Sequence, residues 1–398
     1  MPDERTTEER IGRVTMPKWG LSMKTGKIME WVVEVGDEVE RGDDLAEIDT
    51  DKIAGTLESD HEGVLRRVLV EAGSDAPVGC TIAVVAPEDV PDSEIDAVVK
   101  EAEEQLARGV AEGEEGPRQQ TVEVAGRTIS YTTLGEGSGD GDGDGEDEAI
   151  VLVHGYGGDK NSWLFVQEPL SEGRTVHALD LPGHGDSAKD VGDGSLATLA
   201  DTVTGFLDAL GVQRAHLVGH SMGGAVVTAA AAAAPERVRS LTLVSPAGYG
   251  PEIDASYLRG FASAASRREL KPHLLKLFAD PGLVNRQLVD DLLKYKRLDG
   301  VDGALRTLLG TLLDGDEPAL DVAPLLARTT VPTVVVWGRA DQVIPVSNAE
   351  SSDALKQHAT VHVVDEAGHM AQMETPAAVV SAVQEAVQKA GEQAAGRA

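Results

Sequence analysis

Ser221 stands in a sequence context typical of an activated nucleophile. It is the centre of the pentapeptide GHSMG at 219–223, which fits the pattern G-x-S-x-G and lies between an apolar run and an alanine-rich run. The glycines allow a tight strand-to-helix turn that exposes the serine hydroxyl. Because a serine hydroxyl needs a neighbouring base before it attacks a carbonyl carbon, we expect a base and an acid elsewhere in the chain.

Asp341 and His369 follow Ser221 in the order serine, acid, histidine. Asp341 comes shortly after an apolar run that ends at Trp337, and His369 comes after a run that ends near Val364. Residues after the carboxyl ends of parallel strands gather at one edge of a sheet, where ligand sites lie. We therefore predict Asp341 as the acid and His369 as the general base.

Three other histidines compete with His369 for the role of base: His154, His184 and His220. Each lies inside a tight, glycine-rich turn, where a histidine more often supports the backbone through hydrogen bonds. The order and roles of a catalytic triad also favour His369. We therefore predict structural roles for these three.

Acyl transfer places negative charge on a carbonyl oxygen, which needs two converging backbone N–H donors. One is predicted at Met222, directly after the nucleophile, and the other at Tyr156 in the segment HGYGG at 154–158. Both predictions concern main-chain groups and not side chains.

Lys52 is the second residue with a predicted chemical role, and an internal repeat positions it. The segment 36–45 (GDEVERGDDL) is echoed by 73–82 (GSDAPVGCTI), with glycines six apart and an apolar residue nine positions on. Between the copies, Asp51 and Lys52 occupy the point where a hairpin must reverse. The repeat predicts two similar β half-units with Lys52 at an exposed tip.

The C-terminal two thirds of the chain alternates apolar strands with helical patterns, which predicts a mostly parallel, doubly wound sheet. The expected strands are 149–153, 175–179, 215–218, 241–244, 333–337 and 360–364, and the expected helices are 196–210, 222–234 and 376–390.

The residues around Lys52 resemble the lipoyl domains of 2-oxo acid and acetoin dehydrogenase complexes. The shared residues are TDKI at 50–53 and the upstream GDxVxxG at 36–42. The resemblance implies that Lys52 carries covalent lipoate. Biotin carriers share this fold but have methionines beside the lysine, whereas Asp51 and Ile53 stand here, so lipoate is favoured. A solvated surface lysine is the alternative.

The C-terminal motifs together resemble the α/β-hydrolase family over residues 121–390, in which an insertion such as 251–325 is a helical cap over the active site. The predicted fold is α/β: an N-terminal all-β lipoyl (hammerhead) domain and a C-terminal α/β-hydrolase doubly wound sheet with a helical cap. The predicted boundaries are 11–86 for the lipoyl domain, 87–120 for an acidic linker, 121–392 for the hydrolase domain and about 251–325 for the cap.

Charge and composition exclude several classes of partner. The chain has 68 acidic and 35 basic residues, a net charge of −33, which argues against nucleic acid and anionic membranes. The charged segment 1–10 lacks the apolar core of an export signal, so a cytoplasmic protein is predicted. The segment DGDGDG at 140–145 copies half of a calcium loop, but Val151 replaces its bidentate glutamate. No metal site is predicted, and the single Cys80 forms no intrachain disulfide.

A lipoyl domain fused to an α/β-hydrolase domain is similar to the dihydrolipoamide acetyltransferase components of acetoin dehydrogenase complexes. The resemblance implies that an acetyl group carried on Lys52 passes through Ser221 to coenzyme A. It also implies three associations: a thiamine-diphosphate-dependent acetoin-cleaving component, dihydrolipoamide dehydrogenase, and a homo-oligomer within the complex. Two alternatives stay open. In the first, the chain is a thioesterase or carboxylesterase with a carrier domain attached. In the second, it is a noncatalytic scaffold.

The cap carries a local positive charge in an otherwise acidic chain, with ten basic and six acidic residues between Arg259 and Arg306. One interpretation is that the cluster Lys294, Lys296 and Arg297 attracts an anionic substrate to the covered site. The other is that these residues form the solvated faces of cap helices.

Overall fold

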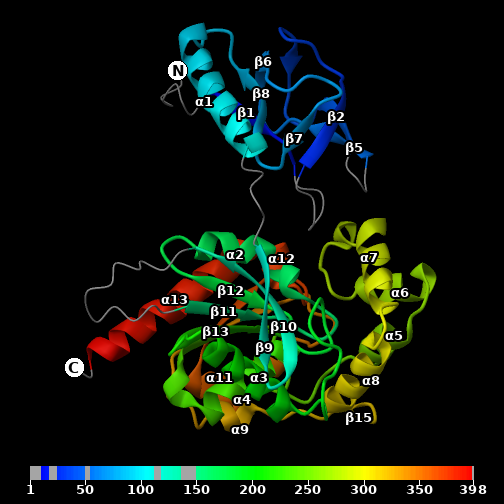
Figure 1. Cartoon of the computed structure of the whole chain (residues 1–398), viewed down its shortest axis with the longest axis vertical. Helices are drawn as coiled ribbons and strands as arrows, with labels where there is room; N and C mark the ends of the chain where they lie inside the picture. The colour runs from blue at the N-terminus through cyan, green and yellow to red at the C-terminus, as the bar shows by residue number, and fades with distance from the viewer. Residues whose placement is uncertain (1–9, 18–24, 50–53, 112–117, 136–148, 397–398) are drawn as a thin grey trace. The chain divides into compact units, whose positions relative to one another are not determined.

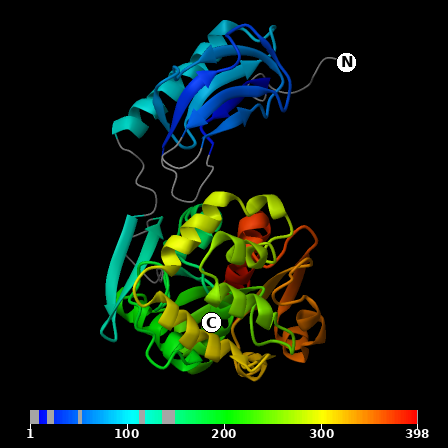
Figure 2. The same cartoon turned by 90° about the vertical axis from the view of Figure 1, so that its right-hand side faces the viewer.

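The structure, a computed structural model, describes residues 10–17, 25–49, 54–111, 118–135 and 149–396. The chain divides into two compact units, Met1–Gly116 and Pro117–Ala398. Figures 1 and 2 show the strand-rich first unit in blue to cyan and the α/β second unit in teal to red. The predicted architecture is confirmed: a β-rich unit precedes an α/β unit built on a mostly parallel sheet.

The N-terminal unit contains two four-stranded sheets, ordered β1-β8-β6-β3 and β5-β4-β2-β7. Each sheet takes strands from both halves of the repeat. The strands are β1 (Gly12–Thr15), β2 (Thr25–Trp31), β3 (Glu38–Val39), β4 (Asp44–Asp49), β5 (Ala54–Glu58), β6 (Gly63–Val68), β7 (Asp75–Pro77) and β8 (Thr81–Ala86).

The repeat seen in the sequence has a backbone explanation. Gly36 and Gly73 have φ values of 105° and 86°, and Gly42 and Gly79 have φ values of 95° and 82°. These are the four glycines that recur in the two copies, and all adopt a conformation that residues with a Cβ rarely tolerate. The repeated turns therefore require glycine at these positions, which confirms the two half-units.

The central part of the segment 87–120, which the sequence predicted as an acidic linker, is helical and packs against strands of the N-terminal unit. Helix α1 (Asp92–Ala111) packs on the N-terminal unit. Ile95 is fully buried in a cluster with β8. The acidic residues of α1 form ion pairs with arginines of β1 and β6: Arg66 with Asp92 (2.8 Å), Arg67 with Asp96 (3.0 Å) and Arg13 with Glu101 (2.6 Å). Composition alone suggested solvation, but an apolar helix face and complementary arginines attach the segment to the unit.

The C-terminal unit is built on an eight-stranded sheet, ordered β18-β17-β14-β13-β11-β12-β10-β9. The six strands from β18 to β12 run parallel, and β10 is antiparallel to both of its neighbours. The strands are β9 (Arg118–Val124), β10 (Arg127–Leu134), β11 (Ala149–Val153), β12 (Val176–Leu179), β13 (Ala215–His220), β14 (Val238–Val244), β17 (Thr333–Gly338) and β18 (Thr360–Val364).

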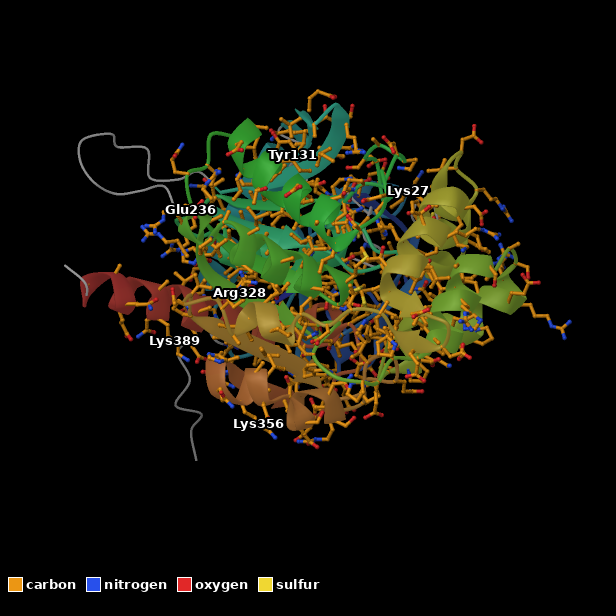
Figure 3. All side chains as sticks on the ribbon, turned by 90° about the horizontal axis from the view of Figure 1, so that it is seen from below. Lys27, Tyr131, Glu236, Arg328, Lys356 and Lys389 are labelled. Carbon is orange, nitrogen blue, oxygen red and sulfur yellow. The ribbon has the colours of Figure 1, made fainter. Side chains whose placement is uncertain are left out.

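Helices cover both faces of this sheet (Figure 1). One face is packed by α2 (Leu164–Leu170), α12 (Ala371–Glu374) and α13 (Pro376–Ala395), and the other by α3 (Leu196–Ala209), α4 (Met222–Ala233), α9 (Ala323–Leu326) and α11 (Asp353–His358). Lys389 of α13 donates a hydrogen bond to Thr360 at the sheet's β18 edge, and the outer α11 carries Lys356; Figure 3 labels both lysines.

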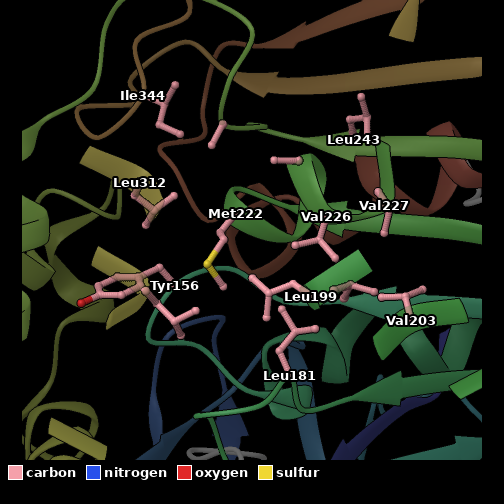
Figure 4. Close-up of a cluster of buried hydrophobic side chains, with 14 of the residues drawn as sticks. Tyr156, Leu181, Leu199, Val203, Met222, Val226, Val227, Leu243, Leu312 and Ile344 are labelled. Atoms are coloured by element: carbon pink, nitrogen blue, oxygen red, sulfur yellow. The ribbon is translucent and has the colours of Figure 1, made fainter. Parts of the chain in front are cut away.

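The two cores of this unit follow from strand periodicity, because successive side chains point to opposite faces. In β11, Ile150 and Leu152 belong to the cluster under α13, whereas Val151 and Val153 belong to the cluster under α3 and α4. Figure 4 shows part of the second cluster, with the Met222 side chain between those of Tyr156 and Val226.

The segment predicted to form a cap lies between β14 and β17, and its helices α5 to α8 with the hairpin after them are called the cap below (Figure 2). They are α5 (Ala255–Ser263), α6 (Arg267–Leu274), α7 (Arg286–Lys296) and α8 (Val301–Leu312), followed by the short hairpin β15 (Leu313–Asp314) and β16 (Glu317–Pro318). Shorter pieces complete the unit: α10 (Ser347–Ser351) and the 3-10 turns η2 (Lys160–Trp163), η3 (Pro235–Arg237) and η4 (Pro281–Leu283). Among the described residues, no helix is both long and apolar enough to span a bilayer.

Candidate active site

Ser221 occupies a strained turn between β13 and α4. Its φ and ψ are 53° and −118°, a region that costs a non-glycine residue about 1–3 kcal/mol. The backbone on both sides holds it there: its N–H donates to Val244 (2.9 Å), and its carbonyl accepts from Gly224 (2.9 Å) and Ala247 (3.0 Å). The surrounding sheet and helix therefore enforce the conformation that presents the side chain.

The glycines of the pentapeptide are required by close backbone contacts. A Cβ on Gly219 would lie 2.4 Å from the carbonyl oxygen of Gly223, and a Cβ on Gly223 would lie 2.4 Å from that of Val153. A Cβ on Gly155 would lie 2.9 Å from the Cβ of Ser221. The loop after β11 thus passes directly against Ser221.

Asp341 and His369 form a buried, oriented pair. His369 Nδ1 lies 2.8 Å from Asp341 Oδ2, with the two side chains 3% and 0% exposed. The other carboxylate oxygen, Oδ1, accepts the N–H groups of Val343 and Ile344, each at 2.8 Å. Since Nδ1 is hydrogen-bonded to the carboxylate, Nε2 is the ring nitrogen that can accept a proton from a serine hydroxyl.

The loop that carries His369 lies beside the strand end that precedes the serine. The ring centroids of His220 and His369 are 4.7 Å apart, and His220 Nε2 donates to the His369 carbonyl at 2.9 Å. The sheet thereby brings the loops after β13, β17 and β18 to one edge. This is the arrangement in which Ser221, Asp341 and His369 were predicted to act.

The three rival histidines all form hydrogen bonds with backbone groups. His154 donates from Nδ1 to Gly155 (2.7 Å) and accepts the Leu181 N–H at Nε2 (3.0 Å). His184 accepts the Gly157 N–H at 3.0 Å, and His220 donates as described above. Burial lowers the pKa of all three imidazoles, which keeps them neutral.

The two predicted oxyanion donors lie on segments that pack around Ser221. Met222 is the first residue of α4, and the first N–H groups of a helix have no acceptor within it. Tyr156 follows Gly155, the residue in close contact with Ser221, and the next amide, Gly157, is fixed by His184. The backbone N–H groups of Tyr156 and Met222 are therefore candidate donors to a developing oxyanion.

A buried ion-pair network supports the Tyr156 loop, and sequence reasoning did not find it. Lys160 Nζ lies 2.7 Å from Asp180 Oδ2 and 2.8 Å from Asp186, with Lys160 and Asp180 only 4% and 0% exposed. Asp180 also accepts the N–H groups of Lys160 (2.7 Å) and Asp186 (2.9 Å). Lys160 and Asp180 are twenty residues apart, and nothing in that spacing showed that they pair.

The cap contacts the same loop from the other side. The Tyr156 hydroxyl donates to the Leu305 carbonyl of α8 at 2.8 Å. Burial raises the pKa of this phenol, so its side chain stays neutral. A Cβ on Gly157 would lie 2.3 Å from the ring of Phe261 in α5. The cap therefore packs tightly on the predicted oxyanion loop.

Most of the cap's basic residues are already paired. Lys294 lies 3.0 Å from Asp291, and Lys296 Nζ donates to the carbonyls of Phe261 and Ala262 at the end of α5. Arg297 lines a cavity of about 130 Å³ together with Lys296 and Asp302. The pairings of Lys294 and Lys296 weaken the interpretation of an anion site for this cluster.

Lys52 and the segment 140–145 lie outside the described residues. Strands β4 and β5 pair as antiparallel neighbours as far as Asp49 and Ala54, so two antiparallel strands frame residues 50–53. This frame fits a lysine-linked carrier group. Within the part of the chain that the structure describes, no group of three or more His, Cys, Asp or Glu side chains is arranged to hold a metal ion.

Comparisons with known proteins cover both units. A family model described as alpha/beta hydrolase fold matches residues 148–376, and one described as biotin-requiring enzyme matches residues 12–85. Two relatives share the description dihydrolipoyllysine-residue acetyltransferase component of acetoin cleaving system. The one from Pseudomonas putida is 46% identical and covers 92% of this chain and 95% of its own; the one from Cupriavidus necator is 44% identical and covers 91% and 93%.

Solved structures resemble the C-terminal unit. A meta-cleavage product hydrolase from Pseudomonas fluorescens is 23% identical, with a TM-score of 0.58, over 68% of this chain and 98% of that one. A likeness at this identity establishes the fold alone.

Proposed function

The chain belongs to the family of dihydrolipoyllysine-residue acetyltransferase components of acetoin cleaving systems, and on this premise we propose that it transfers an acetyl group from lipoyl-Lys52 to coenzyme A through Ser221. The observation that carries the proposal is the buried Asp341–His369 pair beside the Ser221 turn, in a chain that also has a lipoyl-type unit.

When bound, lipoate supplies the acetyl group as a thioester. Ser221 Oγ attacks the thioester carbonyl while His369 Nε2 takes the hydroxyl proton, and Asp341 stabilises the resulting imidazolium. The N–H groups of Tyr156 and Met222 donate to the oxyanion. His369 then returns the proton to the leaving sulfur, which leaves an acetyl ester on Ser221.

The second half repeats these roles with the acceptor. His369 takes the proton of the coenzyme A thiol, whose sulfur attacks the acetyl-Ser221 carbonyl. The ester bond breaks, Ser221 regains its proton from His369, and acetyl-coenzyme A leaves. No step changes an oxidation state, so this chain needs no electron acceptor for the transfer.

Water competes with coenzyme A for the same acyl-serine, which is the basis of the thioesterase alternative. The test is to incubate the protein with acetyl-dihydrolipoamide and coenzyme A and to measure acetyl-coenzyme A and free acetate. We expect acetyl-coenzyme A as the main product and a loss of at least about a thousandfold in Ser221→Ala. Acetate as the main product would establish the thioesterase. If neither acetyl-coenzyme A nor acetate formed, the noncatalytic scaffold would be established.

The finer assignments of partners belong to the same proposal. The relatives' descriptions name an acetoin cleaving system, so this chain is one component among several. We assign a thiamine-diphosphate-dependent component as the source of the acetyl group, dihydrolipoamide dehydrogenase for reoxidation of the dithiol, and a homo-oligomeric assembly within the complex. Copurification of the three components from cells that use acetoin tests these assignments.

A further inference from the structure

Glu374 connects two segments that are far apart in the sequence. It ends α12, five residues after His369. Its Oε2 accepts the N–H of Gly368, the residue before His369, at 2.7 Å. Its Oε1 accepts the N–H groups of Ala279 and Asp280 at 2.7 Å and 3.2 Å. One carboxylate thus binds both the loop of the general base and the cap segment between α6 and η4.

The same two segments are joined by a second set of bonds. The Leu277 carbonyl accepts the N–H groups of His369 (2.8 Å) and Met370 (3.2 Å). A Cβ on Gly368 would lie 2.8 Å from both the Ala279 nitrogen and the Leu277 oxygen. The backbone of 277–280 and that of 368–370 therefore pack with no space between them.

These contacts give Glu374 a role that the triad does not include. Hydrogen bonds to a carboxylate are stronger than those between neutral groups. Because this carboxylate binds both segments, a movement of the cap segment displaces the backbone that carries His369. We propose that Glu374 is a positioning residue that couples the cap to the general base, so that His369 is aligned only while the cap is seated. This inference deepens the proposed function and rests on it for the role of His369.

The first test is Glu374→Gln, with Glu366→Gln as the matched control. Glutamine keeps one acceptor oxygen but turns an NH₂ group toward the other set of amides, so one segment is released. Glu366 is exposed and lies two residues before Gly368. The assay is hydrolysis of p-nitrophenyl acetate, a small ester that needs Ser221 and His369 but little of the cap.

Glu374→Gln is expected to lower kcat for this ester at least about tenfold, with KM changed by less than about twofold, because small displacements of a catalytic group cost rate. Glu366→Gln is expected to retain the original kcat. A raised KM with unchanged kcat would mean that Glu374 only holds the cap on substrate, and would overturn the proposal. The assay contains no coenzyme A, so it stays informative if acetyl transfer itself is not observed.

The second test uses the unaltered protein and therefore does not depend on a variant that folds. Amide hydrogen exchange is measured at Ala279, Asp280, Gly368, His369 and Met370. If the two segments open as one unit, all five amides exchange with the same opening equilibrium, within about a factor of three. Opening equilibria that differ by about a hundredfold between the segments would refute the coupling.

Discussion

Asp341→Asn is expected to inactivate the site while leaving it folded, because the structure dictates how the new side chain must lie. The position of Oδ1 faces two N–H groups, those of Val343 and Ile344 at 2.8 Å. An asparagine oxygen must occupy that position, since its NH₂ group there would leave two buried amides unpaired. The NH₂ group then faces His369 Nδ1.

A donor at that point changes the tautomer of the imidazole. Nδ1 must now accept, so the ring proton moves to Nε2, the nitrogen that has to take the Ser221 proton. Loss of the correct tautomer costs a serine triad about 10⁴-fold in kcat. This corresponds to about 5 kcal/mol of transition-state stabilisation.

The assay is the steady-state rate of acetyl transfer to coenzyme A, with the thermal midpoint as a check of folding. Asp365→Asn is the matched control, because Asp365 is exposed and forms its ion pair with the exposed Arg339. It should stay near the original rate. If Asp341→Asn retained more than about a tenth of kcat, the assignment of Asp341 as the partner of the base would be wrong.

Three further predictions concern the carrier, the buried ion pair and acid stability. Intact mass after coexpression with a lipoyl ligase should show one lipoyl addition that is absent in Lys52→Ala and present in Lys27→Ala; modification elsewhere would contradict the assignment. Lys160→Met should destabilise the C-terminal unit by about 3 kcal/mol, because it leaves the fully buried Asp180 without its cation; calorimetry that shows no larger shift than for the exposed Lys356→Met would refute this. Burial lowers the pKa of His177 from 6.5 to about 4. Between these pH values the unfolded chain binds a proton that the folded chain does not. The free energy of unfolding therefore decreases as the pH falls through that window, by up to about 3 kcal/mol. Urea unfolding from pH 7 to 4.5 should show a shallower pH dependence in His177→Gln, and an unchanged slope would exclude this residue as a source.

The sequence by itself determined the features that depend on local backbone chemistry and on strand order. The four recurring glycines specify turns with positive φ, so the two half-units of the N-terminal unit were predictable. The strand and helix alternation specified a parallel sheet, and parallel strands bring the loops that follow them to one edge. For this reason Ser221, Asp341 and His369 could be proposed as a set from the sequence, although they lie far apart in the chain.

Only the tertiary structure decided which charged groups meet. Lys160 and Asp180 pair in the core, and Glu374 reaches across to the cap, because β11, β12 and the cap are packed together in ways that no local spacing encodes. The acidic segment after residue 87 is a further example, because its composition did not show that its carboxylates pair with arginines of β1 and β6. Single residues and short motifs determine local backbone geometry, whereas long-range electrostatic pairing depends on the fold that brings the partners together.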